Sequence, residues 1–300
     1  MKAQGTLINE FVKGATKGEA SHMSVDGDTL FSYGSHFPLL VRMDWGFLLN
    51  ADKYSSTTSS HQSSCFKHAT IQIPFSALRS AGIPHRAIEL VDHDAQRYDV
   101  IGYTDYEKNI SVAEYNALTK TEKEGFSERT ERRPEAAIIK YDGKHYLSSM
   151  DGWNFFLCQL PEPVETVAEA FASLKPTEVK DENFIRQGEW FFVEATELPI
   201  VMLTDGVPTA WDKMKKFFYK TLTKGFTLPN KNPDGNLHIA TRGVQLGDGI
   251  YVSGQVRHQT RWGGRGDHRM LRLSTLEDIK IYQAFENRAL GSWSASGNVD

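Results

Sequence analysis

Hydrophobic residues in the first half of the chain fall in short runs separated by glycine, proline and other turn residues, a pattern typical of antiparallel strands. Two of these runs predict strands over 29–33 and 39–50, the second with a turn at 44–46. Another pair of runs flanks Asp142 and Gly143, and this dipeptide between β-prone segments favours a tight hairpin within 137–147. The pattern therefore predicts sheet structure in this part of the chain.

Short stretches that follow capping residues predict several helices. The clearest covers 209–224, where apolar residues lie on one face, lysines lie on the other and Gly225 is placed to end the helix. The charged segment 122–135 predicts an exposed linker or a solvated helix. Further helices are expected after Ser55, near 75–81, from Pro84 onward, over 111–123 and from 166 to about 175.

Apolar runs return in the C-terminal part and predict strands over 188–193, 237–240, 250–256 and 270–273. The mixture indicates an α+β fold with largely antiparallel sheets, several short helices and a β-rich C-terminal part. Because the composition shifts between residues 160 and 180, we expect three parts: an N-terminal α+β domain over 1–165 with a Ser/Thr-rich loop, a basic C-terminal α+β domain over 166–290 and a flexible tail over 291–300.

The composition is that of a globular protein. Of 300 residues, 40% are hydrophobic and 24% are charged, which excludes disordered and fibrous classes. No apolar run approaches the roughly 20 residues that cross a bilayer, so no membrane partner is expected. The N-terminus lacks the apolar stretch of a secretory signal, and Cys65 and Cys158 form no CxxC pair. These features favour a reducing compartment and a cytoplasmic location.

Charge is distributed unevenly along the chain. The stretch 209–272 holds twelve lysines and arginines against four aspartates, a balance of +8, although the whole chain carries a net charge of −4. The remainder is therefore at −12. This asymmetry predicts a positive region on an acidic body, which attracts polyanions. The alternative is a solvated surface whose charges pair with nearby acids.

A cluster of hydroxyl side chains lies where a helix is expected to begin. Main-chain N–H groups at such an end bind phosphate, so the following residues are candidate phosphate ligands: Ser55, Thr57, Thr58, Ser59 and His61. The alternative is a polar loop that caps the helix.

One face of the same helix carries three potential metal ligands, which are His61, Cys65 and His68. Three ligands on one helix rarely converge on one ion. We therefore expect a buried cysteine flanked by partly exposed histidines, and no metal site there.

Three C-terminal histidines form a candidate catalytic group, which comprises His238, His258 and His268 with Asp267 beside the last. Imidazoles and a carboxylate can serve as acid and base on a phosphodiester, with or without a divalent metal. The alternative is that these are separate polar histidines with no shared role.

The glycine-rich segment 257–269 carries arginines and a tryptophan. Guanidinium groups bind phosphates and an indole stacks on bases, while an ordinary polar surface loop is the alternative. Together with the lysine face of the 209–224 helix, this segment supplies the candidate nucleic-acid ligands: Lys213, Lys216, Lys220, Arg257, Arg261, Trp262, Arg265 and Arg269.

Several nucleotide and hydrolase motifs are missing from the sequence. It contains no GxxxxGK[ST], GxGxxG, GxSxG or HExxH pattern, which disfavours nucleotide-driven motors, dinucleotide oxidoreductases and α/β-hydrolases. The sequence indicates no particular cofactor.

The segments 33–39, 50–62 and 186–192 are similar to islands in uncharacterised proteins of bacteriophages and other mobile elements. The resemblance implies a context concerned with nucleic acid or host defence. It supplies no assigned catalytic residue.

Three functional hypotheses follow. The first is a nucleic-acid-binding protein whose basic C-terminal region contacts phosphates, with salt-sensitive affinity. The second is a phosphodiester- or nucleotide-directed hydrolase that uses the His/Asp group, with the hydroxyl cluster as a phosphate cradle. The third is an assembly or virion component in which aromatic residues form the contact surface, although core packing is their simpler role. Those aromatics are Trp190, Phe191, Phe192 and Phe217 to Tyr219. The choice of DNA or RNA and the oligomeric state stay open.

Overall fold

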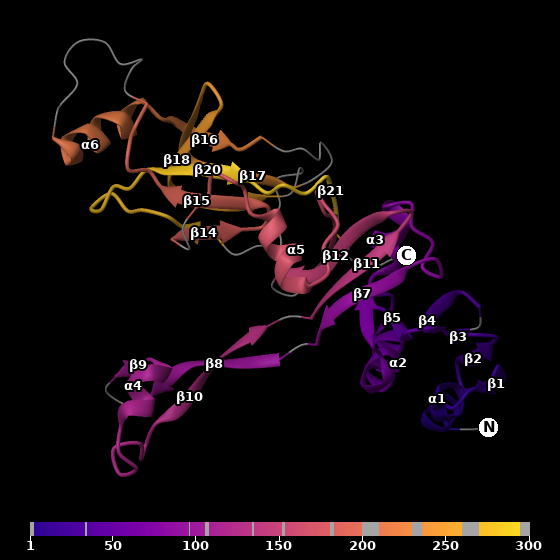
Figure 1. Ribbon diagram of the computed structural model, residues 1–300. Coiled ribbons are helices and arrows are strands. Elements are labelled where there is room, and N and C mark those ends of the chain that lie inside the picture. Colours follow the sequence, from indigo (N-terminus) through magenta and orange to yellow (C-terminus); the bar gives the residue numbers. More distant parts are fainter. Residues whose placement is uncertain are drawn as a thin grey trace. The chain divides into compact units, whose positions relative to one another are not determined.

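The protein is described by a computed structural model (Figure 1), and the description covers residues 3–33, 35–95, 97–105, 108–133, 135–151, 154–180, 183–199, 210–229, 236–259 and 270–294. The chain forms two compact units. Unit 1 comprises 1–157, 164–167 and 293–300, and unit 2 comprises 158–163 and 168–292. The described residues combine short helices with several largely antiparallel sheets, which confirms the α+β class with a β-rich C-terminal part.

Unit 1 begins with a six-stranded sheet in sequence order, antiparallel except for the parallel last pair. Helix α1 (Gln4–Val12) packs its apolar side into the core of this sheet. The strands predicted over 29–33 and 39–50 are confirmed. The sheet consists of β1 (Lys17–Ala20), β2 (Met23–Asp26), β3 (Thr29–Ser32), β4 (Phe37–Met43), β5 (Gly46–Asn50) and β6 (Ile71–Ile73).

Helix α2 (Ser56–Cys65) and the 3₁₀ turn η1 (Phe66–His68) connect β5 to the parallel strand β6, and α3 (Phe75–Ser80) follows β6. The predicted cap of α2 is confirmed, because the Ser55 hydroxyl accepts a bond from the Thr58 N–H. The helix expected from Pro84 is wrong. A single turn forms there, and because Ile83 and Ile88 are both buried in the core, the chain has to return to the sheet within a few residues.

A five-stranded sheet follows, in the order β21-β13-β12-β11-β7. The predicted hairpin is confirmed: Asp142 and Gly143 both have positive φ, at 50° and 72°, and join β11 to β12. Residues 291–294, assigned above to a tail, instead form a strand hydrogen-bonded to β13, and 295–300 lie outside the described residues. The strands are β7 (Glu89–Asp94), β11 (Ala136–Tyr141), β12 (Lys144–Asp151), β13 (Asn154–Gln159) and β21 (Gly291–Ser294).

A three-stranded sheet of β8 (Arg97–Thr104), β9 (Asn109–Ile110) and β10 (Ser127–Arg133) completes unit 1. The capping box between Ser111 and Glu114 opens α4 as expected, but α4 (Val112–Ala117) ends before Lys123. The linker or helix predicted over 122–135 is wrong, because β10 pairs with β8 along its whole length. Pairing with a neighbouring strand stabilises this charged segment as a strand, and the local charge pattern does not predict such pairing.

Unit 2 is built on one large sheet with the order β14-β15-β20-β18-β17-β16, and β19 pairs with β18. Gly225 does not end the last helix as predicted, because this helix ends at Thr221 and Gly225 lies within the following strand. Thr209, the predicted first residue of the helix, lies outside the described residues. The elements are α5 (Val167–Leu174), β14 (Phe184–Gln187), β15 (Trp190–Glu194), α6 (Trp211–Thr221), β16 (Thr223–Thr227), β17 (Leu237–Leu246), β18 (Gly249–Gln259), β19 (Leu271–Arg272) and β20 (Tyr282–Glu286).

The two faces of this sheet carry separate cores. On the face that we call inner, Trp190 and Phe192 pack with Ala240, Val252 and Val256. On the opposite, outer face, α6 packs its apolar side against a second core, in which Tyr251 and Ile281 alternate with Val252 and Tyr282 of the inner core. The expectation that the aromatics of β15 pack in the core is confirmed. Among the described residues, no helix is long and apolar enough to cross a membrane.

Candidate functional site

The structure brings two of the predicted catalytic residues together. His238 on β17 lies directly opposite His258 on β18, and their rings stack with centroids 4.5 Å apart. Both side chains are buried. They alternate with Ala240 and Val256 along their strands, so they point to the inner face of the sheet.

A carboxylate that the sequence analysis missed joins this pair. Glu189 lies in the turn before β15, and its Oε1 is 3.3 Å from His238 Nδ1. Burial by itself would raise the pKa of Glu189, but the hydrogen bond and positive charge of His238, with a smaller effect from His258, hold the pKa below its usual value. Glu189 is about fifty residues from His238 along the chain, so no local spacing could have predicted the contact.

The Glu189, His238 and His258 group has the residue types of an acid/base site. A carboxylate beside an imidazole orients the ring, and imidazoles can accept or donate a proton near neutral pH. The other members of the predicted cluster, Asp267 and His268, lie outside the described residues. Within the part of the chain that the structure describes, no group of three or more His, Cys, Asp or Glu side chains could hold a metal ion.

The predicted lysine face of α6 is exposed to solvent at Lys213, Lys216 and Lys220. These positions are three and four residues apart and therefore share one side of the helix. Lys215 differs, because it forms an ion pair with Asp212 at 3.1 Å.

Arginines of the same unit take two different roles. Arg257 is exposed and alternates with His258, so it points to the outer face, away from the histidine pair. Arg272 is exposed on β19, opposite Gln255, which places it on that same outer face. Arg242 instead donates to the main-chain carbonyls of Tyr219 and Leu222 at the end of α6. The remaining predicted ligands lie outside the described residues; they are Arg261, Trp262, Arg265 and Arg269.

The hydroxyl cluster of α2 is divided between solvent and a buried network. Thr58 and His61 are buried, Ser59 is exposed, and Thr57 is half-buried. The buried members form a chain of hydrogen bonds to other elements of unit 1. The contacts are Gln4 Nε2 to His61 Nε2 at 3.0 Å, His61 Nδ1 to Ser32 Oγ at 2.9 Å, Ser32 Oγ to Thr58 Oγ1 at 3.4 Å and Thr58 Oγ1 to Ser55 Oγ at 3.1 Å.

Burial shifts the pKa values of the His61 imidazole and the Cys65 thiol toward their neutral forms. The pKa of His61 is lowered, first by burial and then by the nearby charge of His22, so the imidazole is neutral at pH 7. Burial raises the pKa of the Cys65 thiol to about 12. Cys65 is therefore a core residue, as expected from the sequence, and not a thiolate ligand. The expectation that His61 is partly exposed is wrong, because its ring is buried among Gln4 and Ser32.

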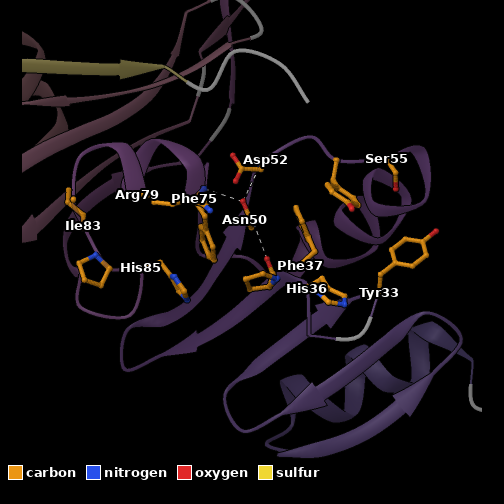
Figure 2. Close-up of a pocket in the computed structure, with 14 residues that line it drawn as sticks. Tyr33, His36, Phe37, Asn50, Asp52, Ser55, Phe75, Arg79, Ile83 and His85 are labelled. Carbon is orange, nitrogen blue, oxygen red and sulfur yellow. Dashed lines mark hydrogen bonds between the residues drawn. The ribbon is translucent and has the colours of Figure 1, made fainter. Parts of the chain in front are cut away.

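Ser55 also lines an open cavity of about 1000 Å³ in unit 1. Two residues shape its floor. The Asn50 side-chain oxygen accepts bonds from the N–H groups of Asp52 and Phe75, and the Asp52 carboxylate accepts bonds from the N–H and the hydroxyl of Ser76. These bonds fix the start of α3 to the end of β5 (Figure 2). The wall therefore has a defined shape, which the sequence analysis did not anticipate.

The segments 33–39 and 50–62, which carry the resemblance noted above, meet at this cavity. Comparison of the chain with protein-family models, with curated proteins and with solved structures finds no match.

Proposed function

We propose that the protein binds nucleic acid through the outer side of unit 2. The observation that carries the proposal is the set of exposed cations there, which belong to α6 and to the outer face of the sheet that α6 covers. They are Lys213, Lys216, Lys220, Arg257 and Arg272. Apart from the Asp212 pair of Lys215, no ion pair with a described residue neutralises the lysines of α6.

Phosphate contacts explain how such a surface would work. Each lysine or arginine that neutralises a phosphate releases a counterion, so the affinity falls steeply as the salt concentration rises. Among the aromatic side chains of α6, Phe218 is buried, and Trp211, Phe217 and Tyr219 are half-buried, so none of them presents a fully exposed ring for stacking on a base. We therefore propose backbone recognition with little sequence preference.

The test is a salt series of binding to labelled single-stranded and double-stranded DNA and RNA. We expect the triple variant Lys213→Gln/Lys216→Gln/Lys220→Gln to weaken binding to every sequence and to reduce the salt slope by up to about 3. The matched control removes three exposed lysines of unit 1 instead, at Lys13, Lys17 and Lys144. Equal affinities for the two triple variants would contradict the proposal, as would absence of binding at low salt.

A phosphodiester- or nucleotide-directed hydrolase is the second candidate, and the Glu189, His238 and His258 group favours it. Loss of general acid/base catalysis typically lowers the rate of a reaction by a factor of about 10² to 10⁴. If this group is catalytic, His258→Gln lowers hydrolysis of bis(p-nitrophenyl) phosphate by such a factor and leaves nucleic-acid affinity unchanged. A wild-type chain that cleaves neither this ester nor RNA would remove the candidate.

A further inference from the structure

The chain of hydrogen bonds below α2 has a fixed direction, and Gln4 sets it. The Gln4 Nε2 atom lies 3.0 Å from both the Ser21 carbonyl oxygen and His61 Nε2. A carbonyl oxygen can only accept, so the Gln4 atom is the amide nitrogen, which carries two protons. His61 Nε2 consequently accepts the second proton. In a neutral imidazole the other nitrogen, Nδ1, then carries the hydrogen.

The direction passes from one hydroxyl to the next. His61 Nδ1 donates to Ser32 Oγ, which leaves the Ser32 proton for Thr58 Oγ1 and the Thr58 proton for Ser55 Oγ. Ser55 Oγ also accepts from the Thr58 N–H at 3.1 Å. A hydroxyl oxygen has two lone pairs, and both are used here. Toward any further partner, the Ser55 hydroxyl can therefore only donate.

The free proton of Ser55 is available to the cavity. Ser55 lines this cavity, and no described residue accepts a hydrogen bond from its hydroxyl. A polar donor held in this way by buried neighbours favours an acceptor group on a ligand. Arg79, exposed at the end of α3, lines the same cavity and carries a positive charge. Both groups suit an anion.

Aromatic side chains make up much of the wall. The Phe75 and His85 rings stack at 4.3 Å on one side of the cavity, and Phe37 lies on the other side together with Ser55 (Figure 2). At the rim, Tyr33 and Tyr54 expose 37% and 45% of their surface. Exposed rings around a cavity favour a flat ring as the occupant.

The main chain at Tyr33 is unusual as well. Its φ is +57°, a left-handed value that costs a bulky residue free energy and that clusters at ligand sites. The ring is held near His22, with centroids 5.2 Å apart.

We propose that this cavity binds a nucleoside monophosphate, with the phosphate accepting the Ser55 hydrogen bond in the field of Arg79 and the base packing against the aromatic wall. The cavity volume of about 1000 Å³ lies at the upper end of the usual range for small-molecule sites, so a nucleotide fits. The site is in unit 1 and does not depend on the basic side of unit 2.

The test is calorimetric titration of the full chain with AMP, GMP, CMP and UMP, each compared with adenosine and with inorganic phosphate. We expect at least one nucleotide to bind about tenfold more tightly than either fragment, because only the nucleotide meets both the donor and the rings. Failure of all four nucleotides to bind at millimolar concentration would overturn the proposal.

Substitutions at Ser55 separate ligand binding from folding. Asp is as good a helix cap as Ser, so Ser55→Asp keeps α2 intact, but it removes the donor and adds a negative charge. We expect Ser55→Asp to abolish nucleotide binding, Ser55→Thr to retain it, and Ser63→Asp, at an exposed position of the same helix, to leave it unchanged. Equal affinities of Ser55→Asp and Ser55→Thr would overturn the proposal. Arg79→Gln is expected to weaken binding about tenfold.

These measurements are independent of the nucleic-acid test. The triple lysine variant of α6 is expected to bind nucleotides like the wild type, and Ser55→Asp is expected to bind nucleic acid with an unchanged salt slope. Loss of both activities in either variant with a native melting profile would contradict two separate sites.

Discussion

At the scale of single residues, the polar contacts of this protein join positions that are distant in the sequence. Glu189, in the turn before β15, meets His238 on β17, about fifty residues later in the chain. In unit 1, the side chain of Gln4 orients His61 from a different helix. Neither contact could be predicted from the residues that neighbour its members in the sequence.

The pKa of Glu189 gives a prediction for Glu189→Gln. Because the pKa is lower in the folded chain than the usual 4.5, the folded state binds fewer protons than the unfolded state at acidic pH. The resulting stability is present above pH 4.5 and is lost as the pH falls through the folded pKa. We expect Glu189→Gln to cost about 1 kcal/mol at pH 7, and the difference from wild type to disappear as the pH falls through the folded pKa of Glu189.

Urea unfolding at a series of pH values measures this difference. Glu197→Gln is the control, since Glu197 is an exposed carboxylate of the same unit. A penalty for Glu189→Gln that stays constant with pH would show that the His238 contact does not depend on the charge of Glu189.

At the scale of elements, local sequence succeeds where a turn or a cap is made by neighbouring residues. The Asp142 and Gly143 turn, the Ser111 and Glu114 capping box and the Ser55 cap were all predictable, because each hydrogen bond or positive φ involves residues within a few positions. Strands β10 and β16 were not predictable. The sequence of β10 is highly charged and β16 follows a helix almost directly, so the strand structure of both depends on pairing with partner strands.

Alanine substitutions at two glycines distinguish the cost of backbone strain from the cost of steric contact. Gly254 has φ +87°, and a Cβ added there would lie 2.8 Å from Thr241 Cβ. Thr241 is held by hydrogen bonds to the main chain of Gln255. Gly143 has φ +72° and open space around it. We expect Gly254→Ala to lower the free energy of unfolding by about 2 to 3 kcal/mol and Gly143→Ala by about 1 kcal/mol.

Chemical unfolding of the two variants provides the comparison. Equal losses would mean that Thr241 moves aside and that backbone strain alone sets the cost at both glycines.

At the scale of the whole molecule, two features stand out. Positive charge concentrates in residues 209–272 of an otherwise acidic chain, and the described cores of the two units have no residue in common. Charge asymmetry concerns attraction of partners rather than fold. Separate cores allow each unit to open by itself.

The buried thiol of Cys65 reports on this opening. Leu30 and Cys65 belong to the same core and are fully buried, so Leu30→Ala, at a typical cost of about 2 to 5 kcal/mol, should speed labelling of Cys65 by a thiol reagent. Val252→Ala, in the inner core of unit 2, should destabilise that unit and leave the Cys65 rate unchanged. Mass spectrometry distinguishes Cys65 from Cys158. Equal acceleration by both variants would mean that the units open together.

The sequence by itself determined the α+β class, the tight hairpin, the capped helices and the basic character of residues 209–272, because these follow from composition, period and short-range hydrogen bonds. Tertiary structure alone decided that Glu189 joins the histidine pair, that Arg257 points away from His258 across the sheet, and that Ser55 becomes a donor facing a cavity. The reason is physical: strand register and core packing set which distant side chains meet, and neither is encoded in the spacing of residues along the chain.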